Sequence, residues 1–445
     1  MIVSLPEMLD ARERRALRQQ VLLRDYGSPL ISFTMNIAGP IKDTPLIRRG
    51  FQIGLRDLEQ LLAVEGARCL HKEVIREHTG CEAILVVDRD AAALKALTES
   101  LENATPLGRL FDMDVLTPSG EKLSRGEPRR CLLCGAVAQG CARSRTHSVL
   151  ELQEKTNRIL EQAILEEDMG YVSRLAQQAL LYEVAVTPKP GLVDRKNNGS
   201  HGDMDFFTFQ RSALALGPYF ETCFRIGFET RADAPEDTFQ RLRFPGKLAE
   251  GKMRGATGNV NTHKGAIFSL GILCGALGRL DREDWKRAEA VLSQCAQMTK
   301  KLLQEDLGAL RPGPGETVGQ QLYLRYGITG VRGQAAAGFP EVLHIGLPKL
   351  EAGIAQGLSL NDAACGALLA LIAHTVDTNM ISRGGIDLQQ ETARQIGLLL
   401  EQMPFPDEET LDALNDSFVE KNLSPGGCAD LLAITLLLHF LKEKL

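Results

Sequence analysis

The sequence lacks a strong basic excess and any hydrophobic run long enough to cross a membrane. It holds 51 Lys and Arg against 57 Asp and Glu, a formal net charge of −6, whereas nucleic-acid-binding domains usually carry a clear positive balance. Its most apolar late run, Leu431–Leu441, is too short to span a bilayer. The segment MIVSLPEMLDARERR has no apolar stretch of the signal-peptide kind. We therefore expect a cytoplasmic protein with no nucleic-acid or membrane partner.

The sequence also lacks a compact cysteine framework. Its ten cysteines are scattered from Cys69 to Cys428, unlike the closely spaced sets of small secreted domains. We therefore expect free thiols in a reducing compartment.

The length and the patterns that are present predict two domains. A chain of 445 residues with 44% hydrophobic residues can build two cores, since domains usually run to roughly 100–200 residues. The first part mixes a helical period with short β-rich runs, which predicts an α+β domain over residues 1–165. We expect helices over residues 7–25 and 54–78, and strands over residues 28–37, 81–88 and 109–116. Long helical patterns follow, and they predict an all-α domain over residues 166–445.

The first motif of the second domain covers residues 187–205, TPKPGLVDRKNNGSHGDMD. Two prolines and a glycine predict a stiff turn. It displays Lys189, Arg195, His201, Asp203 and Asp205. A rigid loop of mixed charge suits ligand binding. The alternative is a solvated loop in which Asp203 caps a helix that begins near Met204.

A second motif, Asn261-Thr262-His263-Lys264-Gly265, opens an apolar helix. Backbone N–H groups at a helix start, together with a lysine, suit a phosphate group. The motif is not a Walker A loop, because the glycine required before the lysine is absent. The alternative is a helix start whose small residues allow close packing.

Three more segments add charged residues to this domain. Arg332 lies in the Gly/Ala-rich turn RGQAAAGFP, Asp377 opens DTN shortly before Arg383, and Asp430 lies in an apolar stretch. A carboxylate in such a stretch is costly unless it is paired or binds a metal, and the alternative for Asp430 is an exposed position or an ion pair. Mg²⁺ prefers oxygen ligands. Its predicted ligands are Asp203, Asp205, Asp377 and Asp430.

These motifs, with SPGG-x-ADLLA, closely resemble the CitG-type triphosphoribosyl-dephospho-CoA synthase family over about residues 170–445. The resemblance implies a reaction of ATP with 3′-dephospho-CoA that releases adenine. It implies triphosphate contacts from Lys189, Lys264, Arg195, Arg332 and Arg383. It further implies a carboxylate base, Asp205 or Asp203, and a histidine, His201 or His263, that protonates adenine. Gln334 departs from the pattern, because the family is expected to have Glu there.

In the first domain, Asp112 and Asp114 stand two residues apart on a probable strand. This spacing points both side chains to one face. Paired carboxylates often hold the Mg²⁺ that neutralises a departing pyrophosphate. The alternative is a solvent-facing strand edge.

A basic segment follows, in which residues 121–150 hold six Lys or Arg and two Glu. Such a patch suits a triphosphate or an acidic carrier protein. The segment also contains Cys131, Cys134, Cys141 and His147. A Cys₃His zinc site is one interpretation, and buried or packed thiols are the other.

The strings MNIAGPIK, GRLFDMDV, RRCLLC and CARSRTH resemble the CitX-type holo-citrate lyase synthase family over about residues 10–165. The resemblance implies that a carrier-protein serine attacks the innermost phosphate of the triphosphoribosyl group and releases pyrophosphate. Asp112 and Asp114 then become candidates for metal ligation and catalysis. The implied phosphate ligands are Lys42, Arg109, Arg143, Arg145 and His147.

We therefore expect a bifunctional enzyme that uses ATP, 3′-dephospho-CoA and Mg²⁺ and acts on the acyl carrier protein of citrate lyase. One alternative is the same chemistry on the carrier protein of malonate decarboxylase. The other is a non-catalytic, zinc-containing scaffold built on the cysteine cluster.

Overall fold

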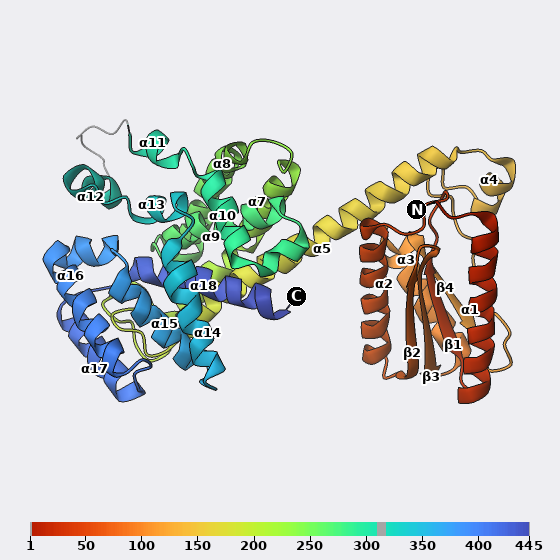
Figure 1. The fold of residues 1–445 in the computed structure, drawn as a ribbon, viewed down its shortest axis with the longest axis horizontal. Helices are drawn as coiled ribbons and strands as arrows, with labels where there is room; N and C mark the ends of the chain where they lie inside the picture. The colour runs from red at the N-terminus through yellow and green to blue at the C-terminus, as the bar shows by residue number, and fades with distance from the viewer. Residues whose placement is uncertain (1, 309–316, 445) are drawn as a thin grey trace. The chain divides into compact units, whose positions relative to one another are not determined.

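The computed structural model describes residues 2–308 and 317–444. Contacts between residues group the chain into two compact units, Met1–Glu167 and Asp168–Leu445 (Figure 1). Helix α5 (Val149–Ala185) contributes to both units.

The N-terminal unit contains a four-stranded antiparallel sheet in the order β2-β3-β1-β4. The strands are β1 (Leu30–Met35), β2 (Arg68–Glu77), β3 (Gly80–Asp88) and β4 (Phe111–Leu116). Helix α1 (Leu5–Tyr26) covers one face, and α2 (Pro45–Val64) and α3 (Ala91–Ala104) cover the other (Figure 1). The unit also contains the short helices η1 (Gly108–Leu110) and α4 (Ala138–Ser144). This architecture confirms the predicted α+β class.

Alternation along the strands divides the core into two layers. Phe33 packs in the larger layer, where its ring stacks on Phe51 of α2 with centroids 4.7 Å apart. Leu30, three residues earlier on β1, packs in the smaller layer beneath α1 with Leu22 and Leu23. Both layers follow from the two-residue side-chain period of a strand.

The predicted helix over residues 54–78 is only half right. The helix ends at Val64, and residues 68–77 form β2, which pairs with β3 alone. An edge strand keeps one side open, and β2 accordingly has no buried residue. Its sequence, RCLHKEVIRE, therefore lacks the apolar alternation that identifies a strand.

The described part of the C-terminal unit is helical, which confirms the predicted all-α class. After α5 it contains α6 (Phe206–Ala215), α7 (Gly217–Glu229), α8 (Pro235–Thr257), α9 (Lys264–Arg279), η2 (Arg282–Lys286), α10 (Ala288–Met298), α11 (Leu302–Asp306), α12 (Val318–Tyr326), α13 (Gly330–Ala336), η3 (Val342–Gly346), α14 (Leu347–Ala355), α15 (Leu360–His374), α16 (Thr378–Gln402), α17 (Glu408–Glu420) and α18 (Gly426–Lys444). Helices α9 and α15 contact α18 in the core, and nearly all of their side chains are buried.

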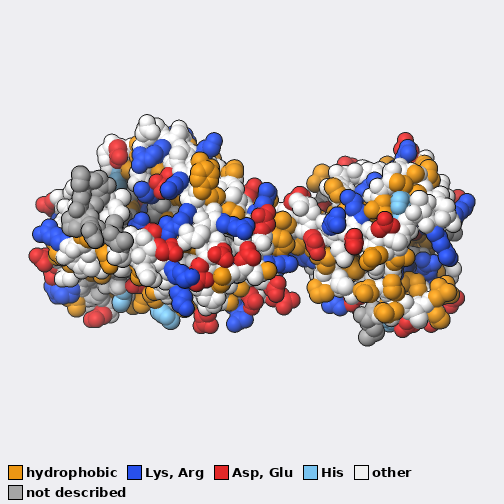
Figure 2. Space-filling view, turned by 90° about the horizontal axis from the view of Figure 1, so that it is seen from above, with side chains coloured by type: hydrophobic (Ala, Val, Ile, Leu, Met, Phe, Trp, Pro, Cys, Tyr) orange, Lys and Arg blue, Asp and Glu red, His pale blue; other side chains and the backbone are white. Residues whose placement is uncertain are grey.

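Charged side chains of both signs are interspersed over the face of the helical unit seen in Figure 2. Within residues 2–308 and 317–444, no single helix has the length and apolarity of a membrane span. Helices α15 and α16, taken together across a 54° bend, have the length and composition of a membrane span, and this rests on length and composition alone.

Candidate active sites

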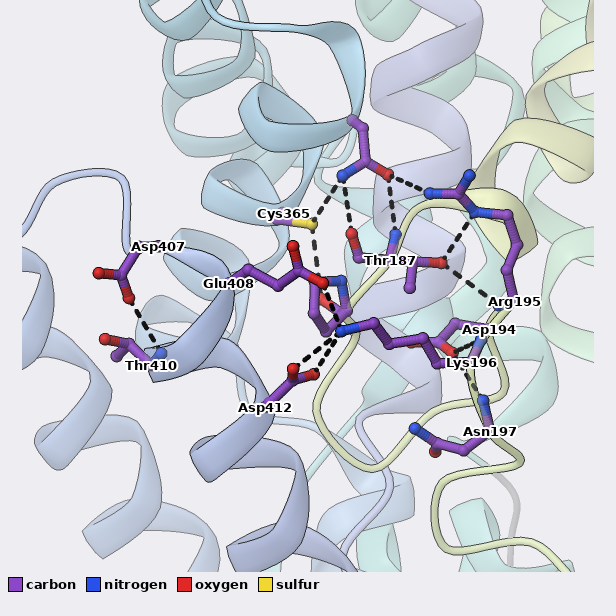
Figure 3. A network of polar contacts seen from close by, with 12 residues as sticks. Thr187, Asp194, Arg195, Lys196, Asn197, Cys365, Asp407, Glu408, Thr410 and Asp412 are labelled. Atoms are coloured by element: carbon purple, nitrogen blue, oxygen red, sulfur yellow. Dashed lines mark hydrogen bonds and ion pairs between the residues drawn. The ribbon is translucent and has the colours of Figure 1, made fainter.

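The first motif of the helical unit is a loop fastened by polar contacts to two helices, α15 and α17 (Figure 3). Arg195 donates to Thr187 Oγ1 at 3.2 Å and to Asn361 Oδ1 of α15 at 3.3 Å. Lys196 Nζ lies 2.5 Å from Glu408 and 2.8 Å from Asp412, both on α17. The stiffness predicted for this loop therefore comes from contacts with two helices as well as from its prolines.

The same loop lies against the turn before α18. Gly191 has φ +72°, and a Cβ there would collide with the carbonyl oxygen of Leu423, so glycine is required for both reasons. Ser200 Oγ donates to the same carbonyl at 2.6 Å. These contacts bring the first motif next to SPGG.

His201 lies where three motifs meet. Its Nε2 lies 2.9 Å from Ser424 Oγ, and its Nδ1 lies 3.3 Å from the guanidinium of Arg383. Arg383 also donates to the carbonyl of Ser200 at 2.9 Å. Burial and then the charge of Arg383 lower the pKa of His201, against the charge of Asp203. The exposed Asp203 therefore belongs to the same cluster.

Asp377 joins the first turns of two helices. Its Oδ1 accepts the N–H groups of Asn379 at 2.8 Å and Met380 at 3.1 Å, which caps α16. Its Oδ2 accepts the N–H of Cys428 in α18 at 2.8 Å. Burial raises the pKa of Asp377, and these N–H groups oppose that shift. The DTN and SPGG motifs therefore form one structural unit.

Asp430 belongs to the first turns of α18, and its side chain lies against the start of α9. Its carboxylate accepts the N–H of Ala266, and Gly265 leaves room for it. The side chain is surrounded by protein, yet the residue is still partly reached by solvent. Burial, and then the charges of Glu183 and Asp377, raise the pKa of Asp430 well above its usual range. The carboxyl group of Asp430 therefore lies where three motifs meet: THKGA, DTN and its own SPGG motif.

His263 completes this interior cluster. It is 3% exposed, and its Nδ1 lies 2.6 Å from Ser212 Oγ. Its Nε2 has no hydrogen-bond partner among the described residues. Burial, and then the charge of Lys189, lower the pKa of His263 to about 3. The imidazole is therefore neutral at pH 7, so His263 does not fit its predicted role as the acid that protonates adenine.

The N-terminal unit has a pocket of about 580 Å³ with a basic lining. Five arginines line it: Arg109, Arg125, Arg129, Arg130 and Arg145. His147 and the first residues of α5 complete its wall. Guanidinium groups bind phosphates in bidentate fashion, so the pocket suits a polyphosphate.

Next to the pocket, Cys131, Cys134, Cys141 and His147 each offer one ligand atom, and these four atoms all lie within 4.8 Å of one another. Cys134 Sγ lies 3.4 Å from Cys141 Sγ. All ten cysteines are free thiols. The pKa of the Cys134 thiol is lowered to about 6, and the hydrogen bond with His147 is the largest cause. These four side chains form a candidate metal site.

Comparison with known proteins supports both resemblances. The model of the CitG family, ATP:dephospho-CoA triphosphoribosyl transferase, matches residues 169–445. The model of the CitX family, apo-citrate lyase phosphoribosyl-dephospho-CoA transferase, matches residues 3–163. Protein CitXG of Haemophilus influenzae is 37% identical, over 98% of this chain and 95% of that protein. The chain belongs to the CitXG family. It is therefore a bifunctional transferase of citrate lyase prosthetic-group synthesis and attachment, not a non-catalytic scaffold.

Two further relatives agree with this assignment. Protein CitXG of Leuconostoc mesenteroides subsp. cremoris is 35% identical, over 98% of this chain and 97% of that protein. A Vibrio cholerae protein named probable 2-(5''-triphosphoribosyl)-3'-dephosphocoenzyme-A synthase is 41% identical over 280 residues, which cover 61% of this chain and 88% of that protein.

Within the CitG part, two predicted residues have other contacts. Lys189 is 1% exposed, and its Nζ lies 2.5 Å from Glu183, so it is an internal ion-pair partner and not an open phosphate ligand. Asp205 caps α6 by accepting the N–H of Thr208 at 2.7 Å. The capping residue is thus Asp205, and not Asp203 as the alternative interpretation had it.

Two predicted cations of the CitG part are also paired. Lys264 lies 3.4 Å from Glu250, and Arg332 lies 3.0 Å from Asp306. The segment around Arg332, predicted as a turn, begins as helix α13. The side-chain oxygen of Gln334 is buried without a hydrogen-bond partner in the described part of the chain.

The predicted four-aspartate Mg²⁺ site is not preformed. Within residues 2–308 and 317–444, the one group of three or more metal-binding side chains drawn together is the Cys₃His cluster. Asp203 and Asp205 lie on the exposed loop, and Asp377 and Asp430 lie at helix starts inside the unit. Two of the four, Asp205 and Asp377, are already used as helix caps.

Within the CitX part, Asp112 and Asp114 do lie on one face of β4, alternating with buried residues. Each is paired with a cation: Asp112 with Arg129 at 2.9 Å and Asp114 with Lys122 at 2.6 Å. No third carboxylate joins them in the described residues. One oxygen of each carboxylate, Oδ1 of Asp112 and Oδ2 of Asp114, is therefore engaged by a cation, and the other oxygen lies outside the pair.

The predicted phosphate ligands of the CitX part divide into two groups. Arg109, Arg145 and His147 line the pocket, whereas Lys42 and Arg143 do not. Lys42 donates to the carbonyl of Ile37, and burial lowers its pKa. Arg143 is exposed on α4.

Sequence reasoning missed Glu102, which lies at the edge of the pocket on α3. It is 2% exposed and accepts hydrogen bonds from Arg125, from Arg129 at 2.8 Å and from the N–H of Met113 at 2.7 Å. Burial raises its pKa against these partners. A lone Glu within an amphipathic helix gives no sequence signal of this kind.

Proposed function

We propose that the CitG part makes 2′-(5″-triphosphoribosyl)-3′-dephospho-CoA from ATP and 3′-dephospho-CoA around Asp430. The CitX part then transfers phosphoribosyl-dephospho-CoA to a serine of the citrate lyase acyl carrier protein at its arginine pocket. The observation that carries this proposal is that motifs scattered over more than 200 residues of sequence meet at two sites of suitable chemistry, one in each unit. We also propose that both steps take place in the cytoplasm.

In the first reaction, the bond between adenine and the ribose of ATP breaks, and a ribose hydroxyl of dephospho-CoA attacks the anomeric carbon. The transition state resembles an oxocarbenium ion. Asp430 is our candidate for the base that accepts the hydroxyl proton, because its carboxylate lies against Gly265 and the N–H of Ala266, where the THKGA and SPGG motifs meet. We therefore assign the role of base to Asp430 and not to Asp205, whose side chain serves as the cap of α6.

The triphosphate of ATP needs positive partners. Arg383 and Arg195 are exposed cations on the rim of the motif cluster, and Lys264 stands at the start of α9. Helix starts favour anions because their first N–H groups have no partner within the helix. We assign phosphate contacts to these three residues.

In the second reaction, the carrier serine oxygen bonds to the innermost phosphorus and releases its proton to water, the bond to the bridging oxygen breaks, and pyrophosphate leaves with that oxygen. Charge builds up on the departing pyrophosphate. Arg109, Arg130 and Arg145 are placed to neutralise it from the pocket wall. Glu102 holds Arg125 and Arg129 in position.

Magnesium fits the exposed carboxylates better than the interior ones. Mg²⁺ usually keeps several waters and binds through one or two carboxylates plus substrate phosphates. Asp203 in the CitG part, and Asp112 and Asp114 in the CitX part, offer such oxygens at accessible positions. Magnesium bound there would neutralise phosphate charge. The thiol-rich cluster calls for a softer ion, and we assign zinc to it.

The test is to mix the protein with ATP, Mg²⁺ and 3′-dephospho-CoA and to follow adenine by chromatography. Adenine should appear only when dephospho-CoA is present. Adding apo-acyl carrier protein should then give pyrophosphate and a mass increase of the carrier. Adenine release that is independent of dephospho-CoA would contradict the first step. Equal modification of a malonate decarboxylase carrier would contradict the assignment to citrate lyase.

A further inference from the structure

The Cys131–His147 segment forms a small metal-binding fold. Arg130 and Val137 pair as an isolated β-bridge, and the N–H of Cys131 donates to the carbonyl of Ala136 at 2.6 Å. This tight turn brings the thiols of Cys131 and Cys134 together. Cys141 lies on α4, and His147 follows that helix. Three sulfurs and one imidazole match the donor set of a tetrahedral structural zinc site and are unsuited to Mg²⁺.

The segment has few buried side chains to hold its shape. None of the described side chains of α4 is buried, and most residues from 124 to 148 are exposed. Ordering a chain without a core costs conformational entropy that burial does not offset. Metal binding supplies the missing free energy in small domains of this kind.

Two local features also require a fixed support. Arg145 ends α4 in the left-handed region, at φ 49° and ψ 41°, which is costly for a residue with a side chain. The Nε2 atom of His147 is buried with no hydrogen-bond partner among the described residues. Such orphan atoms are rare. Ligation of Cys141 and His147 would anchor Arg145 from both sides.

The cluster is continuous with the pocket. Cys131, Cys141 and His147 line the pocket together with Arg130, which precedes Cys131, and Arg145, which lies between Cys141 and His147. We infer that a zinc ion bound by Cys131, Cys134, Cys141 and His147 holds Arg130 and Arg145 in the pocket wall. The four ligands are thus positioning residues, and zinc is required for attachment but not for adenine release. This inference rests on the proposed phosphate-binding role of the pocket.

The experiment uses the full chain and the variant Cys134→Ser. Cys134 is a ligand that does not line the pocket, so the substitution tests the ion rather than a wall contact. The matched control is Cys69→Ser, an exposed free cysteine in the same unit. We expect about one zinc per chain in the unchanged protein and in the control, with X-ray absorption showing three sulfur ligands and one nitrogen ligand. The Cys134→Ser variant should lose zinc, attach at least tenfold more slowly and release adenine at the unchanged rate.

A second arm avoids any folding defect of the variant. Zinc is removed from the unchanged protein with a chelator and then restored, and binding of inorganic tripolyphosphate is measured at each stage. Attachment and tripolyphosphate binding should fall together and recover together. Zinc-free protein that attaches at the full rate would overturn the inference and leave the proposed function intact. Zinc-loaded protein that attaches nothing would instead refute the proposed function, with the zinc site still established.

Discussion

The carboxylate of Asp430 lies so close to Gly265 that a Cβ at position 265 would collide with it. The two residues belong to motifs 165 positions apart in the sequence. Asp430 accepts the N–H of Ala266, the residue after this glycine. The small residue in the THKGA motif is therefore required to admit the carboxylate that we assign to catalysis.

Gly265→Ala is predicted to displace Asp430 and to slow adenine release by more than tenfold. Overpacking of this kind also costs about 1–3 kcal/mol of stability. The matched control is Gly251→Ala on α8, where an added Cβ meets nothing within 4 Å. Adenine release and thermal unfolding of both variants give the comparison. Full activity of Gly265→Ala would separate Asp430 from the reaction.

Asp430→Asn and Asp205→Asn are predicted to behave differently. Loss of a general base lowers a rate by about 10²–10⁴-fold, so Asp430→Asn should release adenine at least 100-fold more slowly. Asn caps helices nearly as well as Asp, so Asp205→Asn should keep most of the activity. Single-turnover adenine release distinguishes the two. A severe defect in Asp205→Asn, with a normal Asp430→Asn, would reverse our assignment.

Glu102→Gln is predicted to weaken attachment and to leave adenine release unchanged. Glutamine has no charge and only one acceptor oxygen, so it can no longer hold both Arg125 and Arg129 at the pocket. We expect the kcat/KM of attachment to fall about tenfold or more, mostly through KM. Glu99→Gln, on the same helix but paired with Lys95, is the control. An unchanged KM in Glu102→Gln would show that these arginines are not held by Glu102.

The neutral, buried His263 predicts a pH dependence of stability. Its pKa is lowered to about 3 in the folded protein, whereas a histidine in an unfolded chain titrates near pH 6.5. The unfolded state therefore binds more protons between these two values, so stability falls as the pH drops below about 6.5. At pH 5 the loss is about 2 kcal/mol relative to pH 7. His263→Gln should lose less stability between pH 7 and pH 5 in urea unfolding. An equal loss would show that His263 is not the cause.

Sequence patterns predicted those structural features that depend on residues close together in the chain. The two-residue period of FDMDV placed Asp112 and Asp114 on one face of β4, and apolar runs identified the buried helices. They did not predict which cation each aspartate would meet, because Arg129 and Lys122 come from a loop. The edge strand β2 was missed because a strand paired on one side does not need an apolar pattern.

In the site of the helical unit, too, local features could be predicted from the sequence, whereas contacts between distant residues could not. The apolar stretch around Asp430 marked that carboxylate as unusual, but the sequence did not show that Lys189, expected on the loop as a phosphate ligand, pairs with Glu183 of α5 inside the unit. Capping by Asp205 and by Asp377 is a short-range hydrogen-bond pattern, and a metal site competes with it for the same Asp residues. Only the folded structure shows whether a given carboxylate caps a helix or is free to bind a metal.

The most direct test of two successive reactions at two separate sites is complementation between two defective chains. Asp430→Asn and Glu102→Gln are each incubated with ATP, Mg²⁺, dephospho-CoA and apo-acyl carrier protein, alone and as a mixture, and the carrier mass is followed. We predict that either chain alone modifies the carrier at least about tenfold more slowly than the unchanged protein, and that the mixture restores the rate, since Glu102→Gln makes the intermediate that Asp430→Asn attaches. Modification by either single variant at the rate of the unchanged protein, or none by the mixture when purified intermediate is also supplied, would contradict the account.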